Sequence, residues 1–526
     1  MTTLAAAPRP VRYYDWISHH ARRTPDKIAL IDLGSDRRIS YKTLDGRIAR
    51  LARHLRESLG IVRGDRVAVL AQNTTDTMEV QFACSRLGAV FVPLNTRLTV
   101  PELEFIVGDA SPRVMIHDDD LEATALAVVE RCKVPSILRV GPGGSYEAAV
   151  AGAARLEQPE IVTLDDLSTI MYTSGTTGRP KGAMITHGMT LWNCINLSPL
   201  AYILPSSVLL TVLPLFHTGG LNCYTNPVLH AGGTVLIMRT FDPGQALKLI
   251  GDPASGINVF FGVPAIYQFM AQHPDFATTD FSRLVIGGVG GAPMPVPLLK
   301  TWEERGVALQ QGYGMTETSP AVLALDREDA AGKAGSAGKP VLHTEVRIVR
   351  PDGTDADIGE LGELWVRGPN ITPGYWNRPD ANITSFTDGW LHTGDATRMD
   401  ADGFYYIVDR WKDMYISGGE NVYPAEVENV LYQLPAVAEA AVIGTPDDTW
   451  GEVGLAIIAL KPGQAASEIE ILAHCRKNLA RFKCPKTISF VSALPRNATG
   501  KVHKPTLRAQ FVASVEPRAA TVENVT

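Results

Sequence analysis

Residues 172–182, YTSGTTGRPKG, gather glycines, hydroxyl side chains and two cations in one short segment. Glycines let the backbone approach a ligand closely, and successive N–H groups in such turns form a nest for an anion. Lys181 adds a compact positive charge. The hydroxyl and glycine positions are Thr173, Ser174, Gly175, Thr176, Thr177 and Gly178. The segment predicts phosphate binding, and a polar surface turn is the alternative interpretation.

The spacing of this segment excludes a Walker A loop. In that loop a lysine directly follows the last glycine, and a magnesium-binding hydroxyl follows the lysine. Here two residues separate Gly178 from Lys181, and Gly182 stands where the hydroxyl would be. The chemistry is still that of a phosphate site, but a P-loop nucleotide hydrolase is not indicated.

Other stretches place charged or aromatic residues beside glycines. They are PLFHTGG (214–220), QGYGMTETSP (311–320), LHTGD (391–395), DRWKDMYISGGENVYP (409–424) and PRNATGKVHK (495–504). Each has an ordinary structural interpretation when taken alone. A carboxylate at a turn is commonly a cap or a solvated group, and a lone surface arginine is commonly part of a weak ion pair.

Composition excludes several classes of protein. The chain has 526 residues, 45% hydrophobic and 20% charged, which is typical of a soluble protein of two to four domains. The 49 basic against 56 acidic residues give a net charge of −7, which argues against a nucleic-acid partner. We expect no transmembrane segment and no signal peptide. Six scattered cysteines without a C-x-x-C pair favour a cytoplasmic protein over a disulfide scaffold or zinc site.

The elements that must position these residues are predicted from hydrophobic patterning. Valine-rich apolar runs at 66–72, 89–94 and 113–117 alternate with helical patterns, which is typical of α/β layers with mostly parallel strands. Residues 74–88 predict a helix capped by Thr75 or Asp76 and ended by Gly88. From about residue 341, alternating sequence and D-G turns predict a small antiparallel sheet, and a compact αβ unit follows residue 420.

The motifs together resemble the adenylate-forming superfamily of acyl- and aryl-CoA synthetases, luciferases and peptide-synthetase adenylation domains. YTSGTTGRPKG, QGYGMTE, TGD, DRWKDMYISGGENVYP and PRNATGK occur in the order of that family, and the resemblance runs from about residue 15 to Lys504. It implies an α/β fold (α+β overall): a large N-terminal region of layered αβαβα subdomains with a small β-barrel-like sheet, and a small mobile C-terminal α+β domain. The implied domains are residues 1–411 and 412–526.

The resemblance also implies a two-step reaction. A carboxylic acid reacts with ATP to give an acyl-adenylate and pyrophosphate, and a thiol such as that of coenzyme A then displaces AMP. The loop at 173–178 and Lys181 would hold the β- and γ-phosphates. Glu317, with Thr176, would bind Mg²⁺, whose preferred ligands are oxygen atoms. Thr316 would contact the α-phosphate.

Further roles follow from the same resemblance. Tyr313 would lie against adenine, and Asp395 would accept both ribose hydroxyls. Arg410 would reach the ribose or a phosphate. Lys501 would bridge the substrate carboxylate and the α-phosphate, where it offsets developing charge. The adenine side would be lined by Gly291, Ala292, Pro293, Gly312 and Gly314.

The acid and the thiol have their own implied residues. His217 would gate the acyl and thiol tunnels as one of the catalytic residues. The acyl pocket would comprise His217, Asn222, Gly287, Gly288, Gly312 and Met315. Lys412 matches the hinge about which the C-terminal domain rotates. Gly418, Gly419 and Glu420 would then meet the pantetheine arm of CoA.

Several functions remain open on the sequence. We favour an acid–CoA ligase that acts on a medium- or long-chain fatty acid. The alternatives are an aryl acid of the hydroxycinnamate or benzoate type, and a stand-alone enzyme that loads a carrier protein. A luciferase-like oxygenase is a weaker third possibility. A homodimer is possible, and the partners expected are small molecules.

Overall fold

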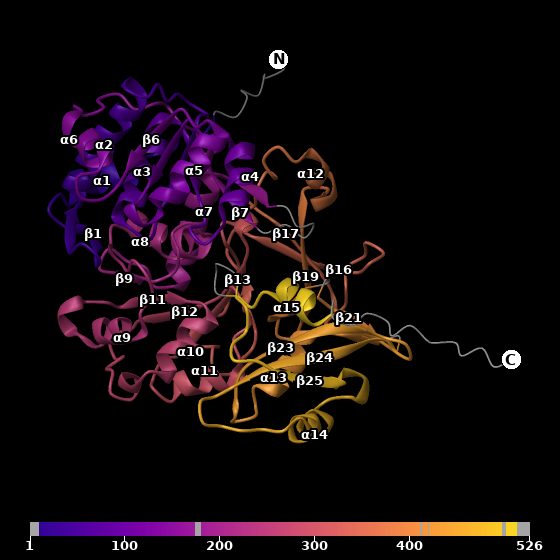
Figure 1. Cartoon of the computed structure of the whole chain (residues 1–526). Coiled ribbons are helices and arrows are strands. Elements are labelled where there is room, and N and C mark those ends of the chain that lie inside the picture. Colours follow the sequence, from indigo (N-terminus) through magenta and orange to yellow (C-terminus); the bar gives the residue numbers. More distant parts are fainter. Residues whose placement is uncertain (1–9, 174–179, 411–412, 419, 497–500, 513–526) are drawn as a thin grey trace, which may run out of the picture.

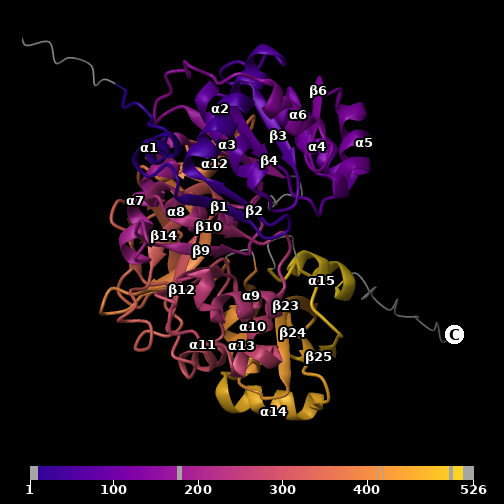
Figure 2. The same ribbon diagram turned by 90° about the vertical axis from the view of Figure 1, so that its left-hand side faces the viewer.

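The computed structural model describes residues 10–173, 180–410, 413–418, 420–496 and 501–512. Within these residues the chain forms two large sheets, two small sheets and the helices that cover them (Figures 1 and 2). Both views place the C-terminal domain, residues 413–512, at the opposite end of the molecule from helices α2 (Tyr41–Glu57) and α6 (Ser145–Gly152). No helix of the described part has the length and apolar character needed to cross a bilayer.

The larger sheet carries most of the predicted site. Its strands, in spatial order, are β15 (Lys339–Pro340), β14 (Ala321–Ala324), β13 (Leu309–Gly314), β12 (Ile286–Val289), β11 (Val259–Gly262), β9 (Val208–Thr211), β10 (Thr234–Ile237), β1 (Ile28–Asp32) and β2 (Arg37–Ser40). The strands from β13 to β1 pair in parallel, and β14, β15 and β2 are antiparallel additions at the two edges. The expected parallel α/β architecture is therefore confirmed here.

The second large sheet ends in the phosphate-loop strands. Its order is β6 (Ser136–Arg139), β5 (Val114–His117), β3 (Arg66–Leu70), β4 (Val90–Pro93), β7 (Leu167–Thr173) and β8 (Lys181–Thr186). β7 and β8 form an antiparallel pair in which Thr173 faces Lys181. The segment between them, which holds Ser174, Gly175, Thr176, Thr177 and Gly178, lies outside the described residues.

Helices fill the spaces around the large sheets. They are α1 (Trp16–Arg23), α3 (Thr75–Leu87), α4 (Val100–Ala110), α5 (Glu122–Cys132), α7 (His187–Leu200), α8 (Thr225–Ala231), α9 (Pro243–Gly251), α10 (Pro264–Gln272) and α11 (Val296–Glu303). The largest core cluster joins apolar residues of both sheets, among them Leu30 of β1, Phe82 of α3 and Phe91 of β4. The two sheets therefore share one core.

Helix α3 has an unusual position. Every residue from Thr75 to Leu87 is buried, although the sequence holds several polar and charged side chains. Thr74 is the N-cap, and its hydroxyl accepts from the Asp76 N–H, so the predicted cap at Thr75 or Asp76 was wrong by one or two residues. Gly88 ends the helix in the left-handed conformation, as predicted. The buried charged side chains of α3 therefore need partners within the protein.

The last third of the chain forms the two small sheets. The first contains β16 (Glu345–Val349), β17 (Gly362–Arg367), β19 (Trp390–Met399), β18 (Phe386–Thr387) and β20 (Tyr405–Arg410), with α12 (Pro379–Ser385) beside it. The C-terminal domain contains β22 (Glu420–Val422), β21 (Tyr415–Ser417), β24 (Gly451–Leu460), β23 (Val437–Asp447) and β25 (Thr487–Phe490), with α13 (Pro424–Leu431), α14 (Glu468–Asn478) and α15 (Lys504–Phe511). The antiparallel sheet and the αβ unit expected from the sequence are both present.

Candidate active site

The ends of β12 and β13 form one edge of the site. The two strands are parallel neighbours, so the glycines that follow β12 lie beside those that end β13. A Cβ atom on Gly290 would lie 3.1 Å from the carbonyl oxygen of Gly312, and Gly291 has a φ of +82°. Only glycine fits this close approach comfortably. Ala292 and Pro293 continue from this edge, as their place in the sequence requires.

A hairpin extends the same edge. β13 pairs with β14 from Gly312 to Gly314, and the 3-10 turn Thr316–Thr318 forms the tip. Thr316 and Glu317 are both buried there. The Glu317 carboxylate accepts a hydrogen bond of 2.8 Å from the hydroxyl of Tyr375, and the Thr372 N–H donates to the Glu317 carbonyl at 2.7 Å. The two proposed nucleotide contacts are therefore held on a fixed turn.

Tyr375 is a site residue that the sequence analysis missed. Its ring lies under Lys181, with 5.1 Å from the ammonium nitrogen to the ring centroid, while its hydroxyl bonds Glu317. The segment around it is held against β8, because the Trp376 N–H donates to the Gly182 carbonyl at 2.8 Å. One tyrosine thus connects the phosphate-loop strand to the hairpin. The sequence PGYW was the available signal: an aromatic pair directly after a glycine.

Asp395 and Tyr313 meet at the other side of the hairpin. The Tyr313 hydroxyl donates to the Asp395 carboxylate at 2.5 Å, across 82 residues of sequence. Asp395 is buried in β19, and its backbone pairs with that of Arg410 in β20. The side chain of Arg410 lies outside the described residues. The structure therefore brings together the aromatic residue and the carboxylate that were predicted for adenine and ribose.

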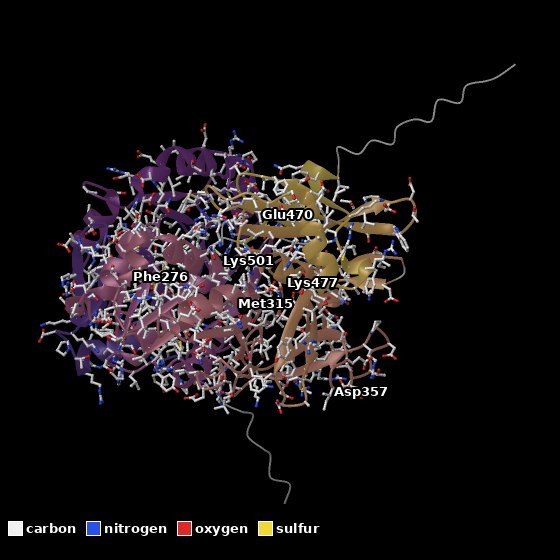
Figure 3. All side chains as sticks on the ribbon, turned by 90° about the horizontal axis from the view of Figure 1, so that it is seen from below. Phe276, Met315, Asp357, Glu470, Lys477 and Lys501 are labelled. Carbon is white, nitrogen blue, oxygen red and sulfur yellow. The ribbon has the colours of Figure 1, made fainter. Side chains whose placement is uncertain are left out.

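Lys501 reaches this edge from the C-terminal domain. A Cβ atom on Gly291 would lie 3.6 Å from Cε of Lys501. Figure 3 shows Lys501 and Met315 where the small domain meets the large one. Burial and, to a smaller extent, the positive charge of Lys501 together lower the pKa of His217 to about 3. The described arrangement thus places the lysine beside both the glycine edge and the histidine.

His217 begins the acyl side of the site. Its Nδ1 accepts from the Gly219 N–H at 3.2 Å, and its carbonyl accepts from Gly220 and Leu221. A π-helical turn, Gly219–Cys223, follows and carries Asn222 in a buried position. Such turns occur frequently at functional sites. With the lowered pKa, the imidazole is neutral at physiological pH, and its Nδ1 serves as a hydrogen-bond acceptor.

The two adjacent glycines of β12 face opposite sides of the sheet. Gly288 faces the acyl side, where a Cβ atom would meet the Tyr224 ring and lie 2.9 Å from Cδ2 of Phe261. A Cβ atom on Gly287 would instead lie 2.9 Å from Leu309 in the core behind the sheet. Side chains alternate along a strand, so the two cannot share a pocket. We therefore correct the predicted acyl pocket by removing Gly287.

The predicted CoA residues do not join this edge in the described arrangement. The Gly418 N–H donates to the Trp450 carbonyl at 2.8 Å, and Glu420 pairs with Ser417 in a hairpin of the C-terminal domain. Gly419 and the predicted hinge residue Lys412 lie outside the described residues. Lys501 is thus at the site while the contacts of Gly418 and Glu420 are within their own domain.

The residues of the site fit a magnesium nucleotide. No group of three or more His, Cys, Asp or Glu side chains in the described part is arranged to hold a metal ion. Glu317 offers one carboxylate, and Mg²⁺ commonly binds through one or two carboxylates together with substrate phosphates and water. When bound, the ion would neutralise phosphate charge.

Comparisons with known proteins agree with this geometry. The profile of the AMP-binding enzyme family matches residues 17–376, and that of the AMP-binding enzyme C-terminal domain matches residues 426–501. A feruloyl-CoA synthase of an Amycolatopsis species is 44% identical over 94% of this chain and 98% of its own. Indoleacetate–CoA ligase of Aromatoleum aromaticum is 39% identical over 95% and 98%. Long-chain-fatty-acid–CoA ligase FadD13 of Mycobacterium tuberculosis is 37% identical over the same shares.

A solved structure gives the same result for the fold. ATP-bound MatB from Rhodopseudomonas palustris superposes with a TM-score of 0.87 and 33% identity, covering 95% of this chain and 100% of that one. The fold, the converging site residues and these matches along almost the whole sequence lead to one conclusion. The chain belongs to the AMP-binding enzyme family, the adenylate-forming CoA synthetases.

Proposed function

We propose that this enzyme activates an aromatic carboxylic acid of the hydroxycinnamate type and transfers the acyl group to CoA. The chain is an ATP-dependent, AMP-forming acid–CoA ligase, and ATP, Mg²⁺ and CoA are its cofactors. The observation that carries the aromatic assignment is the wall formed by Tyr224 and Phe261 over Gly288.

This wall consists of two rings that are tilted toward each other. The rings of Tyr224 and Phe261 lie 5.0 Å apart between centroids, at an interplanar angle of 56°. A Cβ atom on Gly290 would lie 3.3 Å from the Phe261 ring, so the ring runs along the glycine edge without intervening side chains. Planar acids stack well on such a surface. Glycines opposite an aromatic ring therefore favour a flat substrate.

The space behind the wall is small. The cavity lined by Leu213, Gly219, Gly220, Tyr224, Thr225 and Phe261 has a volume of about 10 Å³, roughly enough for one water molecule. Neither an aromatic ring nor an alkyl chain fits in that volume, so Tyr224 and Phe261 would have to move for either class of acid. The cavity volume by itself therefore does not discriminate between them.

The names of the relatives also favour an aromatic acid as the substrate. The feruloyl-CoA synthase and the indoleacetate–CoA ligase are named for aromatic acids and are 44% and 39% identical, and the fatty-acid ligase follows at 37%. All three relatives are named as CoA ligases or CoA synthases, which favours CoA over a carrier protein as the acceptor. The preference for fatty acids is therefore replaced by the aryl assignment.

The roles of individual residues remain part of this proposal. Lys501 brings the acid carboxylate and the α-phosphate together, and its charge offsets their repulsion. Tyr313 and Asp395 bind the adenosine, while Lys181 and Glu317 hold the phosphates and Mg²⁺ on either side of Tyr375. The neutral His217 separates the acyl and thiol approaches. Rotation about Lys412, at the proposed 411/412 boundary, would exchange Lys501 for Gly418 and its neighbours.

A substrate panel tests the proposal. Pyrophosphate release is measured with ATP, Mg²⁺ and ferulate, benzoate, dodecanoate or hexadecanoate, each with and without CoA. We expect kcat/KM for ferulate to exceed that for either fatty acid by at least about tenfold, since one poorly matched substrate group commonly costs that much. Higher kcat/KM with a fatty acid would overturn the aryl assignment. Release that CoA does not accelerate would point to a carrier protein.

A further inference from the structure

One buried asparagine connects the acyl side of the site to the nucleotide hairpin. Asn193 lies on α7 and is 0% exposed. Its Nδ2 donates to the Asn222 carbonyl at 2.7 Å, and its Oδ1 accepts from the Ala321 N–H at 3.2 Å. The two partners fix the orientation of the amide, because its nitrogen must face a carbonyl and its oxygen an N–H.

Each partner belongs to a segment that carries chemistry. Asn222 lies in the π-helical turn between His217 and the aromatic wall residue Tyr224. Ala321 closes the hairpin whose tip holds Thr316 and Glu317, and its backbone pairs with Gly314. A single side chain therefore spans the two elements that must present the acid and the nucleotide to each other.

Other hydrogen bonds hold each segment on its own side. Within the turn, the Asn226 side chain donates to the Asn222 carboxamide at 2.8 Å. At the hairpin, Asn370 donates to the Ala321 carbonyl at 2.7 Å and to the Thr318 carbonyl at 3.1 Å. These bonds stiffen the two segments separately, whereas Asn193 bonds to both.

We propose that Asn193 is a positioning residue that sets the distance between the acyl turn and the nucleotide hairpin. The acid carboxylate must approach the α-phosphate to about 3–3.5 Å with the correct alignment, and a shift of about 1 Å can cost about 100-fold in rate. Asn193 contacts neither substrate itself. Its effect is exerted through Asn222 and Ala321.

Asn196 offers a matched control on the same helix. It lies one turn further along α7 and is 1% exposed, but its Oδ1 bonds the backbone and ring of His343 instead of the site. Asn196→Ala therefore removes a buried amide of the same kind and burial without touching the acyl turn or the hairpin.

The test is kinetic, with ferulate as the acid. If ferulate is not turned over, the best acid of the panel above takes its place, so failure of the aryl assignment leaves this test intact. Asn193→Ala should lower kcat for pyrophosphate release by about 100-fold, whereas Asn196→Ala should leave it within about threefold. Circular dichroism and thermal melting on all variants give the folded fraction.

A second variant separates the two arms of the amide. Asn193→Asp keeps the acceptor for the Ala321 N–H but places a carboxylate oxygen against the Asn222 carbonyl. It should raise KM for the acid by about tenfold or more and leave KM for ATP within about twofold. The proposal is overturned if Asn193 and Asn196 variants lose activity only in proportion to folded protein, or if Asn193→Asp affects both KM values equally. If Asn193→Ala does not fold, Asn193→Ser replaces it, and its kcat for pyrophosphate release is compared with that of Asn196→Ala.

Discussion

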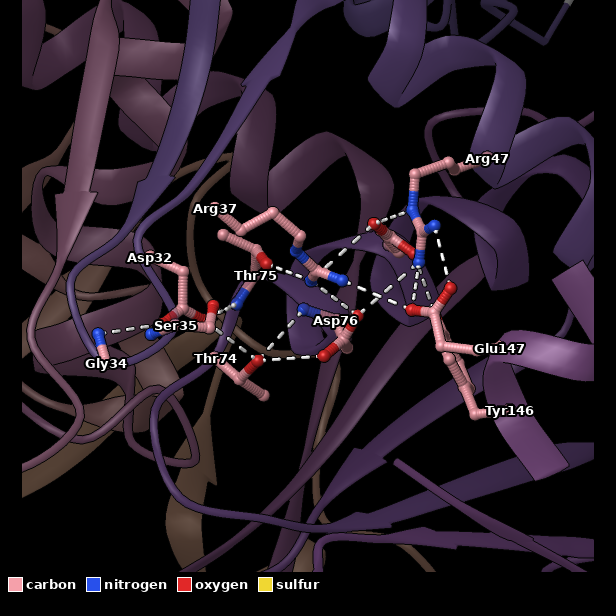
Figure 4. Close-up of polar contacts among 11 residues, drawn as sticks. Asp32, Gly34, Ser35, Arg37, Arg47, Thr74, Thr75, Asp76, Tyr146 and Glu147 are labelled. Atoms are coloured by element: carbon pink, nitrogen blue, oxygen red, sulfur yellow. Dashed lines mark hydrogen bonds and ion pairs between the residues drawn. The ribbon is translucent and has the colours of Figure 1, made fainter. Parts of the chain in front are cut away.

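Charged residues are treated differently in two regions of this enzyme. Around α3, guanidinium groups lie directly against buried carboxylates (Figure 4). At the active site, the carboxylates of Glu317 and Asp395 accept from tyrosine hydroxyls, and Lys181 lies over a tyrosine ring. Arginines contact the carboxylates of the first region, whereas tyrosines contact the carboxylates and the lysine of the second, where a nucleotide and Mg²⁺ would bind.

The α3 network is extensive. Arg37 contacts Asp76 at 2.6 Å, and Arg47 contacts Glu79 at 2.6 Å and Glu147 at 2.7 Å. The hydroxyl of Tyr146 donates to Glu79 at 2.8 Å, and Asp32 accepts from the Thr75 N–H at 3.3 Å at the start of the helix. Because α3 is buried, the carboxylates of Asp76 and Glu79 are withdrawn from bulk water and depend on the partly exposed guanidinium groups of Arg37 and Arg47. Their role is to stabilise the fold.

The largest effect is expected when this network is broken. Arg47→Ala removes the closest guanidinium group from the fully buried Glu79 and leaves Arg37 alone to face three carboxylates, so it should lower the free energy of unfolding by about 3–5 kcal/mol. Urea denaturation measures this loss. KM for ATP of the protein that remains folded should stay within about twofold. A normal unfolding curve with a raised KM would contradict the division between the two regions.

At Lys501 we expect the opposite result, a loss of activity without a loss of stability. Lys501→Ala should lower the rate of adenylate formation by about 10²–10³. Thioester formation from supplied acyl-AMP and CoA should be largely retained, and the melting temperature should not change. Pyrophosphate release and CoA consumption measure the two half-reactions separately. Equal loss of both would remove the assigned role from this lysine.

The network should also make the free energy of unfolding depend on pH. Two arginines face three carboxylates, and burial raises the pKa of Glu79 to about 7, with the nearby Asp76 acting in the same direction. A raised folded-state pKa contributes stability that is present below the ordinary value of 4.5 and is lost as pH rises through about 7. Melting between pH 5.5 and 8 should show this fall, with a slope of at most about 1.4 kcal/mol per pH unit.

Glu79→Gln supplies the control for the pH prediction. The amide does not titrate, so the melting temperature of this variant should change less over the same range than that of the unmodified enzyme. An unchanged slope would mean that another group is responsible.

The smallest predicted effect concerns Tyr375. Tyr375→Phe keeps the ring beneath Lys181 and removes only the hydroxyl that donates to Glu317. Hydrogen bonds to charged groups contribute about 1.5–3 kcal/mol, so KM for ATP at limiting Mg²⁺ should rise by about tenfold. Tyr375→Leu also removes the ring and should raise it further. Equal KM values for the Phe variant and the unmodified enzyme would place Tyr375 outside the nucleotide site.

Much of the fold was predictable because its signals are local. Valine-rich runs, D-G turns and Gly88 each act over a few residues, and the strands, hairpins and helix end appear where they predict. The predicted cap was one or two residues too late because three adjacent residues, Thr74, Thr75 and Asp76, can all cap a helix.

Less of the candidate site than of the fold could be predicted from the sequence. The motifs predicted roles for Tyr313, Asp395 and Lys501, but not the partners that hold such residues in place. Tyr375 and Asn193 act through residues 58 and 128 positions away, and no local pattern encodes such contacts. Gly287 was misplaced because the side of a strand that faces a pocket depends on its neighbours in the sheet.

The most direct test of the central claim is the binding of a stable acyl-adenylate analogue. Isothermal titration calorimetry would compare feruloyl-sulfamoyl-adenosine with the hexadecanoyl counterpart on the unmodified enzyme and on Asp395→Ala. We predict that the feruloyl compound binds at least about tenfold more tightly than the alkyl compound, and that Asp395→Ala weakens both. Tighter binding of the alkyl compound, or binding that does not depend on Asp395, would contradict the account.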